Sequence, residues 1–386
     1  MGDVQVPQLL RAVEAAAPVQ AVELFAFELA EQFGAEQVSF LITDLNGGQL
    51  VRLTQSRRQG PGAEDAEQVP LADPSSPPVR ALTDQDVVFV EEDGGVRVLA
   101  PVSARGDAMG VLELVVPTHA VPQRRQIEDA AKALAYLVTS ERRYTDLYEW
   151  GQRSRPVSLA AEIQRRLLPD AFSCDAGQFS LAGWLEPASS VGGDTFDYSL
   201  DSNSLNVSIT DAMGHEVDAA LLATLAVAGL RNARRAGDSL ATAAGSAAEA
   251  IDERQHGFGY VTGWMAAFDL DTGRARVVNA GHPSPFLVRD GRVERLEFAP
   301  NLPLGISPAL RYVEHEWKIE PGDRLLLVTD GMLERAAADV DLPALLHDHQ
   351  DLHPRQLVQE LSAAVRDAAG PELEDDATVL CLDWNG

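Results

Sequence analysis

Four aspartates in the second half of the chain occupy positions from which their side chains can meet. Asp194 follows two glycines in VGGD, which let the backbone turn tightly and come close to another group. Asp211 and Asp330 each end a strand-forming run, in SITDAMGH and LVTDGM, and Asp375 directly precedes the last such run, in EDDATVLCL. Because aspartates at strand ends point into the crevice at a sheet edge, we expect these four to form one acidic cluster.

Such a cluster calls for a cation, since carboxylates a few ångströms apart raise one another's pKa. Neither Cys174 nor Cys381 has metal-type spacing, and an all-oxygen donor set favours Mg²⁺ or Mn²⁺ over Zn²⁺. Two ions that share one aspartate, about 3.5–4 Å apart, would hold a water and lower its pKa enough to make it a nucleophile. Taken singly, each aspartate is more simply a turn residue. The metal hypothesis rests on the occurrence of all four aspartates at strand ends.

Composition and charge exclude several classes of function. The 59 acidic residues outnumber 31 Lys and Arg, for a formal net charge of −28, so nucleic acid is a poor partner. The N-terminal MGDVQVPQLL has no secretory profile, and the longest apolar run, 219–230, is far shorter than the roughly 20 residues that cross a bilayer. Together with the few cysteines, these features predict a cytoplasmic protein without a membrane span.

The first part of the chain alternates helical and strand patterns. Residues 7–33 hold two helical patterns, each opened by a proline, and Gly34 is the stop signal. Residues 35–56 and 87–116 hold strand-forming runs separated by turns, the first of them Asn46-Gly47-Gly48. The Pro/Gly-rich residues 59–78 are expected to be a loop. These elements predict a small α+β module with an antiparallel sheet.

A long helical pattern connects this module to the rest of the chain. It runs from Pro122 to about Leu168, with an interruption expected near Pro156. Because a helix between domains has little else to cover its apolar side, we expect its stripe to form a homodimer contact, with packing onto its own module as the alternative. The stripe consists of Ile127, Ala131, Leu134, Leu137, Val138 and Leu147.

Residues 155–386 carry six ordered motifs that resemble PPM-type, protein phosphatase 2C-like Ser/Thr phosphatases of the SpoIIE group. An entry helix EIQRRLLP (162–169) precedes them. The motifs are VGGDTFD (191–197), TDAMGH (210–215), NAGHP (279–283), PLGI (303–306), PGDRLLLVTDGMLE (321–334) and DDATVL (375–380). The resemblance implies an αββα two-sheet sandwich with two Mn²⁺ or Mg²⁺ ions at one end of the sheets.

The resemblance also implies residue roles. Asp194 is similar to the acidic residue at the second metal, Asp211 to the bridging aspartate, and Ala212 lies where a backbone carbonyl is a ligand. Asp330 and Asp375 resemble the remaining ligands of the first metal. The implied reaction is in-line hydrolysis of phosphoserine or phosphothreonine without a phosphoenzyme. The implied protein substrate is an anti-sigma-factor antagonist.

Some positions depart from the family pattern or leave it ambiguous. Asp376 competes with Asp375 for the ligand role, and we prefer Asp375. Glu216 replaces the usual glycine and Thr195 the usual aromatic residue. These two changes motivate a rival hypothesis, a catalytically inactive phosphatase-like scaffold that docks a partner. We favour an active enzyme because all four candidate ligands are present. The likeness of GGDTF to the diguanylate cyclase motif is superficial, since Thr195 stands where that motif has a carboxylate.

Residues 10–140 resemble a GAF sensor domain, in the order of helices and strands and in LAPVSARGDAMGVLELVV (99–116). The resemblance implies a regulatory pocket between sheet and loops that could take a small-molecule ligand, without specifying which; the alternative is a purely structural, dimer-forming GAF domain. The absence of cysteine from this module excludes a thioether-linked bilin. The predicted plan is therefore a GAF-like sensor (10–140), a helical connector (122–168) and a phosphatase domain (155–386), with the sensor acting through the connector and the helix near 218–235.

Overall fold

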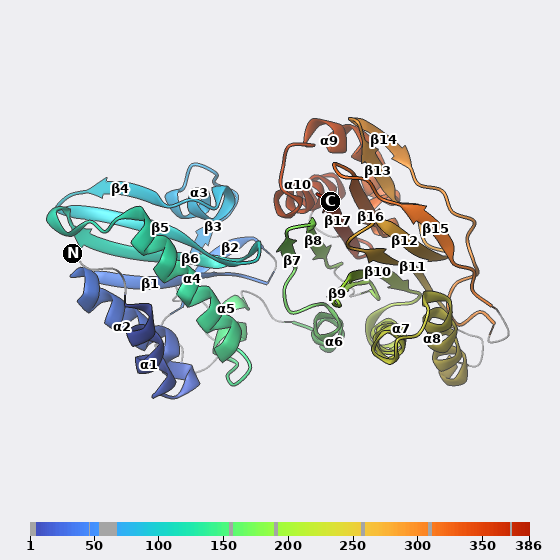
Figure 1. Cartoon of the computed structure of the whole chain (residues 1–386), viewed down its shortest axis with the longest axis horizontal. Helices are drawn as coiled ribbons and strands as arrows, with labels where there is room; N and C mark the ends of the chain where they lie inside the picture. Colours follow the sequence, from blue (N-terminus) through green and yellow to red (C-terminus); the bar gives the residue numbers. More distant parts are fainter. Residues whose placement is uncertain are drawn as a thin grey trace. The chain divides into compact units, whose positions relative to one another are not determined.

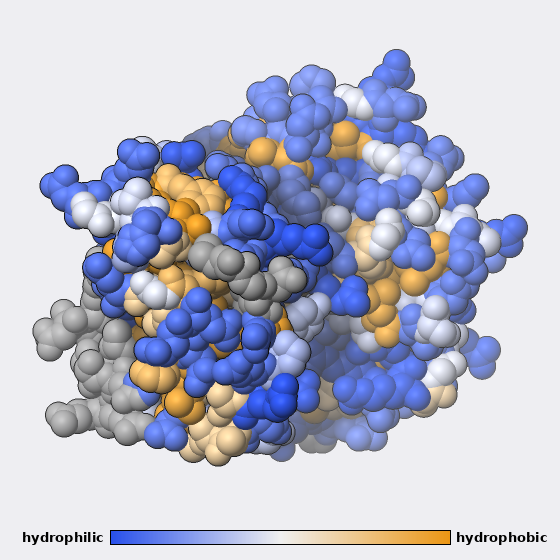
Figure 2. Space-filling model, turned by 60° about the vertical axis from the view of Figure 1, so that its left-hand side comes forward, coloured by the Kyte–Doolittle hydropathy of each residue, from blue (hydrophilic) through white to orange (hydrophobic). Residues whose placement is uncertain are grey.

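The chain forms two compact units, Met1–Pro156 and Val157–Gly386 (Figure 1). The computed structural model describes residues 5–45, 47–53, 68–153, 157–188, 192–255, 259–307, 311–370 and 373–386. Within these ranges, no helix combines the length and the apolar character needed to span a bilayer. The face drawn in Figure 2 is mostly hydrophilic, with smaller apolar areas between the polar side chains.

The first unit is an antiparallel sheet with helices packed on it, in the strand order β3-β2-β1-β6-β5-β4. Helix α2 ends at Gly34, whose φ of 61° lies in the left-handed region that glycine tolerates. The mixed α+β class is confirmed here, and the GAF-like identity of the unit stays a prediction. The elements are α1 (Val6–Glu14), η1 (Pro18–Gln20), α2 (Ala21–Phe33), β1 (Gln37–Thr43), β2 (Gln49–Leu53), β3 (Gln68–Pro70), α3 (Pro77–Asp84), β4 (Val88–Glu92), β5 (Gly95–Ala104), β6 (Asp107–Pro117) and η4 (Thr118–Ala120).

The expectation of one long connecting helix was wrong. Its range holds three helices, α4 (Arg124–Glu141), α5 (Leu147–Gln152) and α6 (Leu159–Leu167). Helix α4 ends at Glu141, and the turn that follows lets α5 pack on β1 and β2. The interruption expected near Pro156 is confirmed by the described residues on either side of it, because α5 ends at Gln152 and α6 begins at Leu159.

The apolar stripe of the connector does not face a second copy of the chain. Its α4 members are each at most 5 % exposed and belong to the core of the first unit, against which Leu147 also packs. The alternative, packing onto its own module, is therefore what the structure shows, because the sheet and α1 and α2 already cover this side. The homodimer itself stays a prediction, without the contact that was expected to form it.

The second unit contains two antiparallel sheets packed face to face, in the orders β15-β12-β11-β10-β9 and β14-β13-β16-β17-β8-β7. An apolar core that includes Phe196, Trp264 and Leu380 fills the space between them. The strands are β7 (Ser173–Ala176), β8 (Phe179–Glu186), β9 (Thr195–Leu200), β10 (Ser204–Ala212), β11 (Val261–Asp269), β12 (Arg274–Ala280), β13 (Phe286–Arg289), β14 (Arg292–Arg295), β15 (His315–Lys318), β16 (Arg324–Val328) and β17 (Ala377–Trp384).

Helices cover both outer faces of this sandwich, which gives four layers (Figure 1). Helices α7 (Glu216–Ala236) and α8 (Leu240–Gln255) lie on the five-stranded sheet, and α9 (Leu342–Asp348) and α10 (Pro354–Ala369) on the six-stranded sheet. The apolar residues of α10 that face its sheet recur at helical spacing, as Leu357, Leu361 and Val365. Two short 3₁₀ segments, η5 (Asp330–Met332) and η6 (Arg335–Asp339), follow β16.

Candidate metal centre

Strand pairing places the predicted ligands at one end of the two sheets. In the first sheet, the start of β9 lies beside the end of β10, with Thr195 opposite Thr210. In the second, the end of β16 lies beside the start of β17, with Val328 opposite Val379. The acidic residues follow from these positions: Asp194 directly before β9, Asp211 in β10, Asp330 opening η5, and Asp375 and Asp376 directly before β17.

Glycines of two motifs permit the close approach of these segments. A Cβ atom on Gly193 would lie 2.6 Å from the Ala212 carbonyl oxygen and 2.5 Å from the Ala212 Cβ. A Cβ atom on Gly331 would lie 2.0 Å from the carbonyl oxygen of Asp376. Any side chain at either position would push the acidic segments apart. The glycines next to Asp194 and Asp330 are therefore explained by packing.

The carboxylates repel one another in a buried environment. Burial is the main cause that raises the pKa of Asp194 well above its ordinary value, and the charges of Asp211 and Asp376 raise it further. Burial, followed by the charges of Asp330, Asp375 and Asp376, raises the pKa of Asp211 to about 7. A hydrogen bond between the side chains of Asp194 and Asp211 offsets part of this repulsion. Two carboxyl groups can share such a bond only when one of them holds a proton.

Hydroxyl groups hold the Asp194 carboxylate from the side of the second sheet. Thr329 and Thr378 each donate to its Oδ2 at 2.7 Å, and all three residues are at most 2 % exposed. Thr329 directly precedes Asp330, and Thr378 lies two positions after Asp376. The same two segments therefore supply both acidic groups and hydroxyl groups to the site. The two threonines were not predicted as site residues, although both belong to the quoted motifs.

Asp376 serves as an anchor for neighbouring segments. Its carboxylate accepts from the backbone N–H groups of Ala188 at 2.8 Å and Gly192 at 3.1 Å, and from Gln164 Nε2 at 2.5 Å. Asp375 is less buried, and its Oδ1 accepts the backbone N–H of Asp376 at 3.0 Å. With Asp376 committed to three bonds, Asp375 is the better candidate ligand of the pair, which stays a prediction.

Gln164 is a site residue that motif analysis missed. It lies on α6, is 2 % exposed, and its Nε2 also donates to the backbone carbonyl of Asp194 at 2.9 Å. Its position in the helix could have indicated this role, because Gln164 shares the buried face of an amphipathic helix with Ala160 and Leu167. A polar residue on such a face needs a partner inside the fold.

The donor set fits a hard divalent cation, although the side chains are not gathered into a cage. Among the described residues, no three Asp, Glu, His or Cys side chains come close enough together to hold one ion. Asp194 illustrates the reason, since its carboxylate is occupied by two hydroxyls and a carboxyl neighbour. The raised pKa values nevertheless show several oxygen donors that lack a balancing positive charge.

The two departures from the family pattern, Thr195 and Glu216, leave the candidate ligands in place. Thr195 is buried, and its hydroxyl bonds that of Thr210 at 2.6 Å, which joins β9 to β10 beside Asp211. Glu216 is exposed and opens α7 with a φ of 55°, in the left-handed region that suits the usual glycine. Neither change removes a candidate ligand.

Known proteins resemble parts of the chain. Residues 201–385 match the family model of stage II sporulation protein E (SpoIIE), so Asp194 lies ahead of the matched residues. Phosphoserine phosphatase RsbU of Bacillus subtilis (strain 168) is 24% identical over 274 residues, which cover 66% of this chain and 80% of that relative. Phosphoserine phosphatase RsbP of the same organism is 27% identical over 206 residues, 51% of this chain and 49% of RsbP, so the chain spans about half the length of RsbP.

Among solved structures, the SiaA-PP2C domain of Pseudomonas aeruginosa is 22% identical, and the match covers 58% of this chain and 93% of that domain with a TM-score of 0.49. The matches to the family model and to the two phosphatases identify a protein phosphatase of the PPM type, and therefore a hydrolase. Within that class, residues 201–385 are similar to the SpoIIE family.

Proposed function

We propose that the unit Val157–Gly386 hydrolyses phosphoserine or phosphothreonine on a regulatory protein, using two Mn²⁺ or Mg²⁺ ions. Asp194, Asp211, Asp330, Asp375 and the Ala212 carbonyl would hold the ions. The supporting observation is that separate motifs bring mutually repelling carboxylates, Asp194 buried and the others half-buried, to one end of both sheets. The two relatives named above as phosphoserine phosphatases support the same reaction.

The chemistry divides between ions and protein. PPM phosphatases use Mn²⁺ or Mg²⁺, as in the structures of RsbX with magnesium and PstP with two manganese ions. When bound, such ions supply positive charge for the phosphoryl oxygens and lower the pKa of water. In this chain, the aspartates would hold these ions at the sheet ends. Gln164 bonds Asp376 and the Asp194 backbone, and Thr329 and Thr378 orient the Asp194 carboxylate.

The proposal extends to partner and regulation. The substrate is a phosphorylated anti-sigma-factor antagonist, in keeping with the SpoIIE-type domain. The GAF-like first unit binds a small molecule and modulates activity through the helices that precede and follow the acidic segments. We further propose that the protein works in the cytoplasm as a homodimer. The net charge of −28 supports a protein substrate over nucleic acid.

The direct test is phosphate release by the full chain from a phosphorylated antagonist with Mn²⁺. We expect release that disappears with chelator and in Asp211→Asn, because this aspartate faces candidate ligands from both sheets. The matched control Asp238→Asn changes an exposed aspartate just after α7 and should keep wild-type release. Metal-independent binding of the antagonist without phosphate release would support the inactive scaffold instead.

A further inference from the structure

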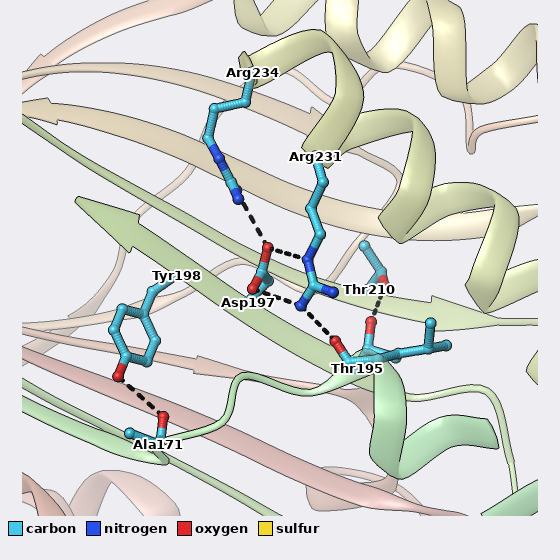
Figure 3. A network of polar contacts seen from close by, with 8 residues as sticks. Ala171, Thr195, Asp197, Tyr198, Thr210, Arg231 and Arg234 are labelled. Carbon is cyan, nitrogen blue, oxygen red and sulfur yellow. Dashed lines mark hydrogen bonds and ion pairs between the residues drawn. The ribbon is translucent and has the colours of Figure 1, made fainter. Parts of the chain in front are cut away.

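Asp197, three residues beyond Asp194, is buried and forms an ion pair with the half-buried Arg231 (Figure 3). Arg231 Nε donates to Asp197 Oδ2 at 3.0 Å and its Nη2 to Oδ1 at 2.9 Å, so the contact is bidentate. The Asp197 side chain is 8 % exposed, and the pair joins β9 to the last part of α7. The same hydrogen bonding is the main cause that raises the pKa of Arg231 above its already high ordinary value.

Arg231 makes one contact that its neighbour Arg234 does not make in this network. Its Nη2 also donates to the backbone carbonyl of Leu167 at 2.6 Å, and Leu167 is the last residue of α6. Carbonyls in the last turn of a helix have no partner within that helix, so this bond caps the end of α6. Arg234 donates only to Asp197 Oδ2, at 3.2 Å, in the contacts drawn in Figure 3.

The capped turn carries the residue that contacts the acidic cluster. Gln164 precedes Leu167 by three residues and bonds both Asp376 and the Asp194 carbonyl. Contacts therefore run from β9 through the Arg231 guanidinium to the end of α6, and from Gln164 back to the two acidic segments. Because Gln164 is 2 % exposed and its amide must reach two acceptors, a small rotation of α6 would break these bonds.

We propose that Arg231 is a positioning residue for the metal centre: by binding Asp197 and the Leu167 carbonyl together, it fixes α6 so that Gln164 holds Asp376 and the Asp194 backbone in place for ion binding. This inference rests on the proposed function, since it assumes that the acidic cluster binds divalent ions. It assigns no contact of Arg231 with substrate or ion.

Comparison of the variants Arg231→Lys and Arg234→Lys distinguishes this positioning role from a role in which the arginines only neutralise the charge of Asp197. Both changes keep a positive charge near Asp197, so neither leaves the buried carboxylate without a cation. One ammonium group cannot reproduce the fork that serves Asp197 and the Leu167 carbonyl at once. The single contact of Arg234 is within the ability of a lysine. A structural role through charge alone predicts equal behaviour of the two variants.

Mn²⁺ titration by calorimetry on the full chain is the test, with amide hydrogen exchange of residues 159–168 as a metal-free readout. We expect Arg231→Lys to raise the Mn²⁺ Kd about tenfold, the low end of losses when groups that orient ligands are removed. Exchange in α6 should rise, and kcat at saturating Mn²⁺ should stay within about twofold of wild type, because the ligands themselves remain. Arg234→Lys should match the wild type in all three readouts.

A further variant tests the route through α6. In a Gln164→Met background, Arg231→Lys should weaken Mn²⁺ binding no further, because the contact it positions is already gone. Equal Kd values for wild type, Arg231→Lys and Arg234→Lys would overturn the proposal. Equal losses of Mn²⁺ affinity in both variants would also overturn it. So would a loss of affinity from Arg231→Lys that is as large in the Gln164→Met background as in the wild type. Failure of the wild type to bind Mn²⁺ would refute the metal centre itself. In that case, amide exchange in α6 that is the same in Arg231→Lys as in wild type would still refute the proposal that Arg231 fixes α6.

Discussion

Asp211 lies in surroundings that disfavour its own charge. Burial and three neighbouring aspartates raise its pKa to about 7, so in the metal-free protein it takes up a proton that the unfolded chain would release near pH 4. A folded pKa above the unfolded value adds stability at low pH, and this contribution is lost as the pH rises through 7. The fold thus keeps a costly acid at a position where only a cation makes it favourable.

This cost predicts that Asp211→Asn stabilises the metal-free protein. At pH 8 with chelator, we expect its free energy of unfolding to exceed that of wild type by about 1–2 kcal/mol, part of the roughly 4 kcal/mol that a three-unit shift represents. At pH 5 the difference should shrink to about a third of its value at pH 8, because the folded carboxyl is then protonated while the unfolded one, with a pKa near 4, is still mostly ionised. Urea unfolding at the two pH values measures both quantities. A variant less stable than wild type at pH 8 would contradict the repulsion described here.

At the scale of elements, the acidic segments meet because glycines remove side chains from their contacts. Four candidate acids could be named from their motifs, since the spacing of glycine and aspartate at strand ends is local information. Gln164, Thr329 and Thr378 could not, because their role depends on which distant segments pack together. The same limit explains the connector: its apolar stripe was visible in the sequence, but the core that covers it was not.

Gly193→Ala tests the close approach of β9 to β10. Its Cβ would meet the Ala212 carbonyl oxygen at 2.6 Å, so we expect a loss of about 1–3 kcal/mol in the free energy of unfolding, typical of overpacking. Mn²⁺-dependent phosphate release should fall with it, because Asp194 must move. Gly177→Ala is the matched control, since its Cβ meets nothing within 4 Å in the turn between β7 and β8. Wild-type activity in Gly193→Ala would show that this contact does not position the site.

At the scale of the whole molecule, each unit has its own core, and only the second contains the candidate metal centre. The αββα order of layers followed from the family resemblance, because strands that end in aspartate and alternate with helices fit several sheet architectures. The GAF-like identity of the first unit rests on a weaker pattern, a common order of helices and strands. The net charge of the whole chain gave one further prediction, because an excess of acidic residues disfavours binding to nucleic acid.

The central claim is that acids from distant parts of the chain bind divalent ions at one place. Anomalous diffraction from crystals of the full chain grown with Mn²⁺ tests it most directly, because manganese is located without reference to a structural hypothesis. We expect two anomalous peaks about 3.5–4 Å apart, bounded by Asp194, Asp211, Asp330 and Asp375. Manganese peaks elsewhere, with these four carboxylates uncoordinated at saturating Mn²⁺, would contradict the account.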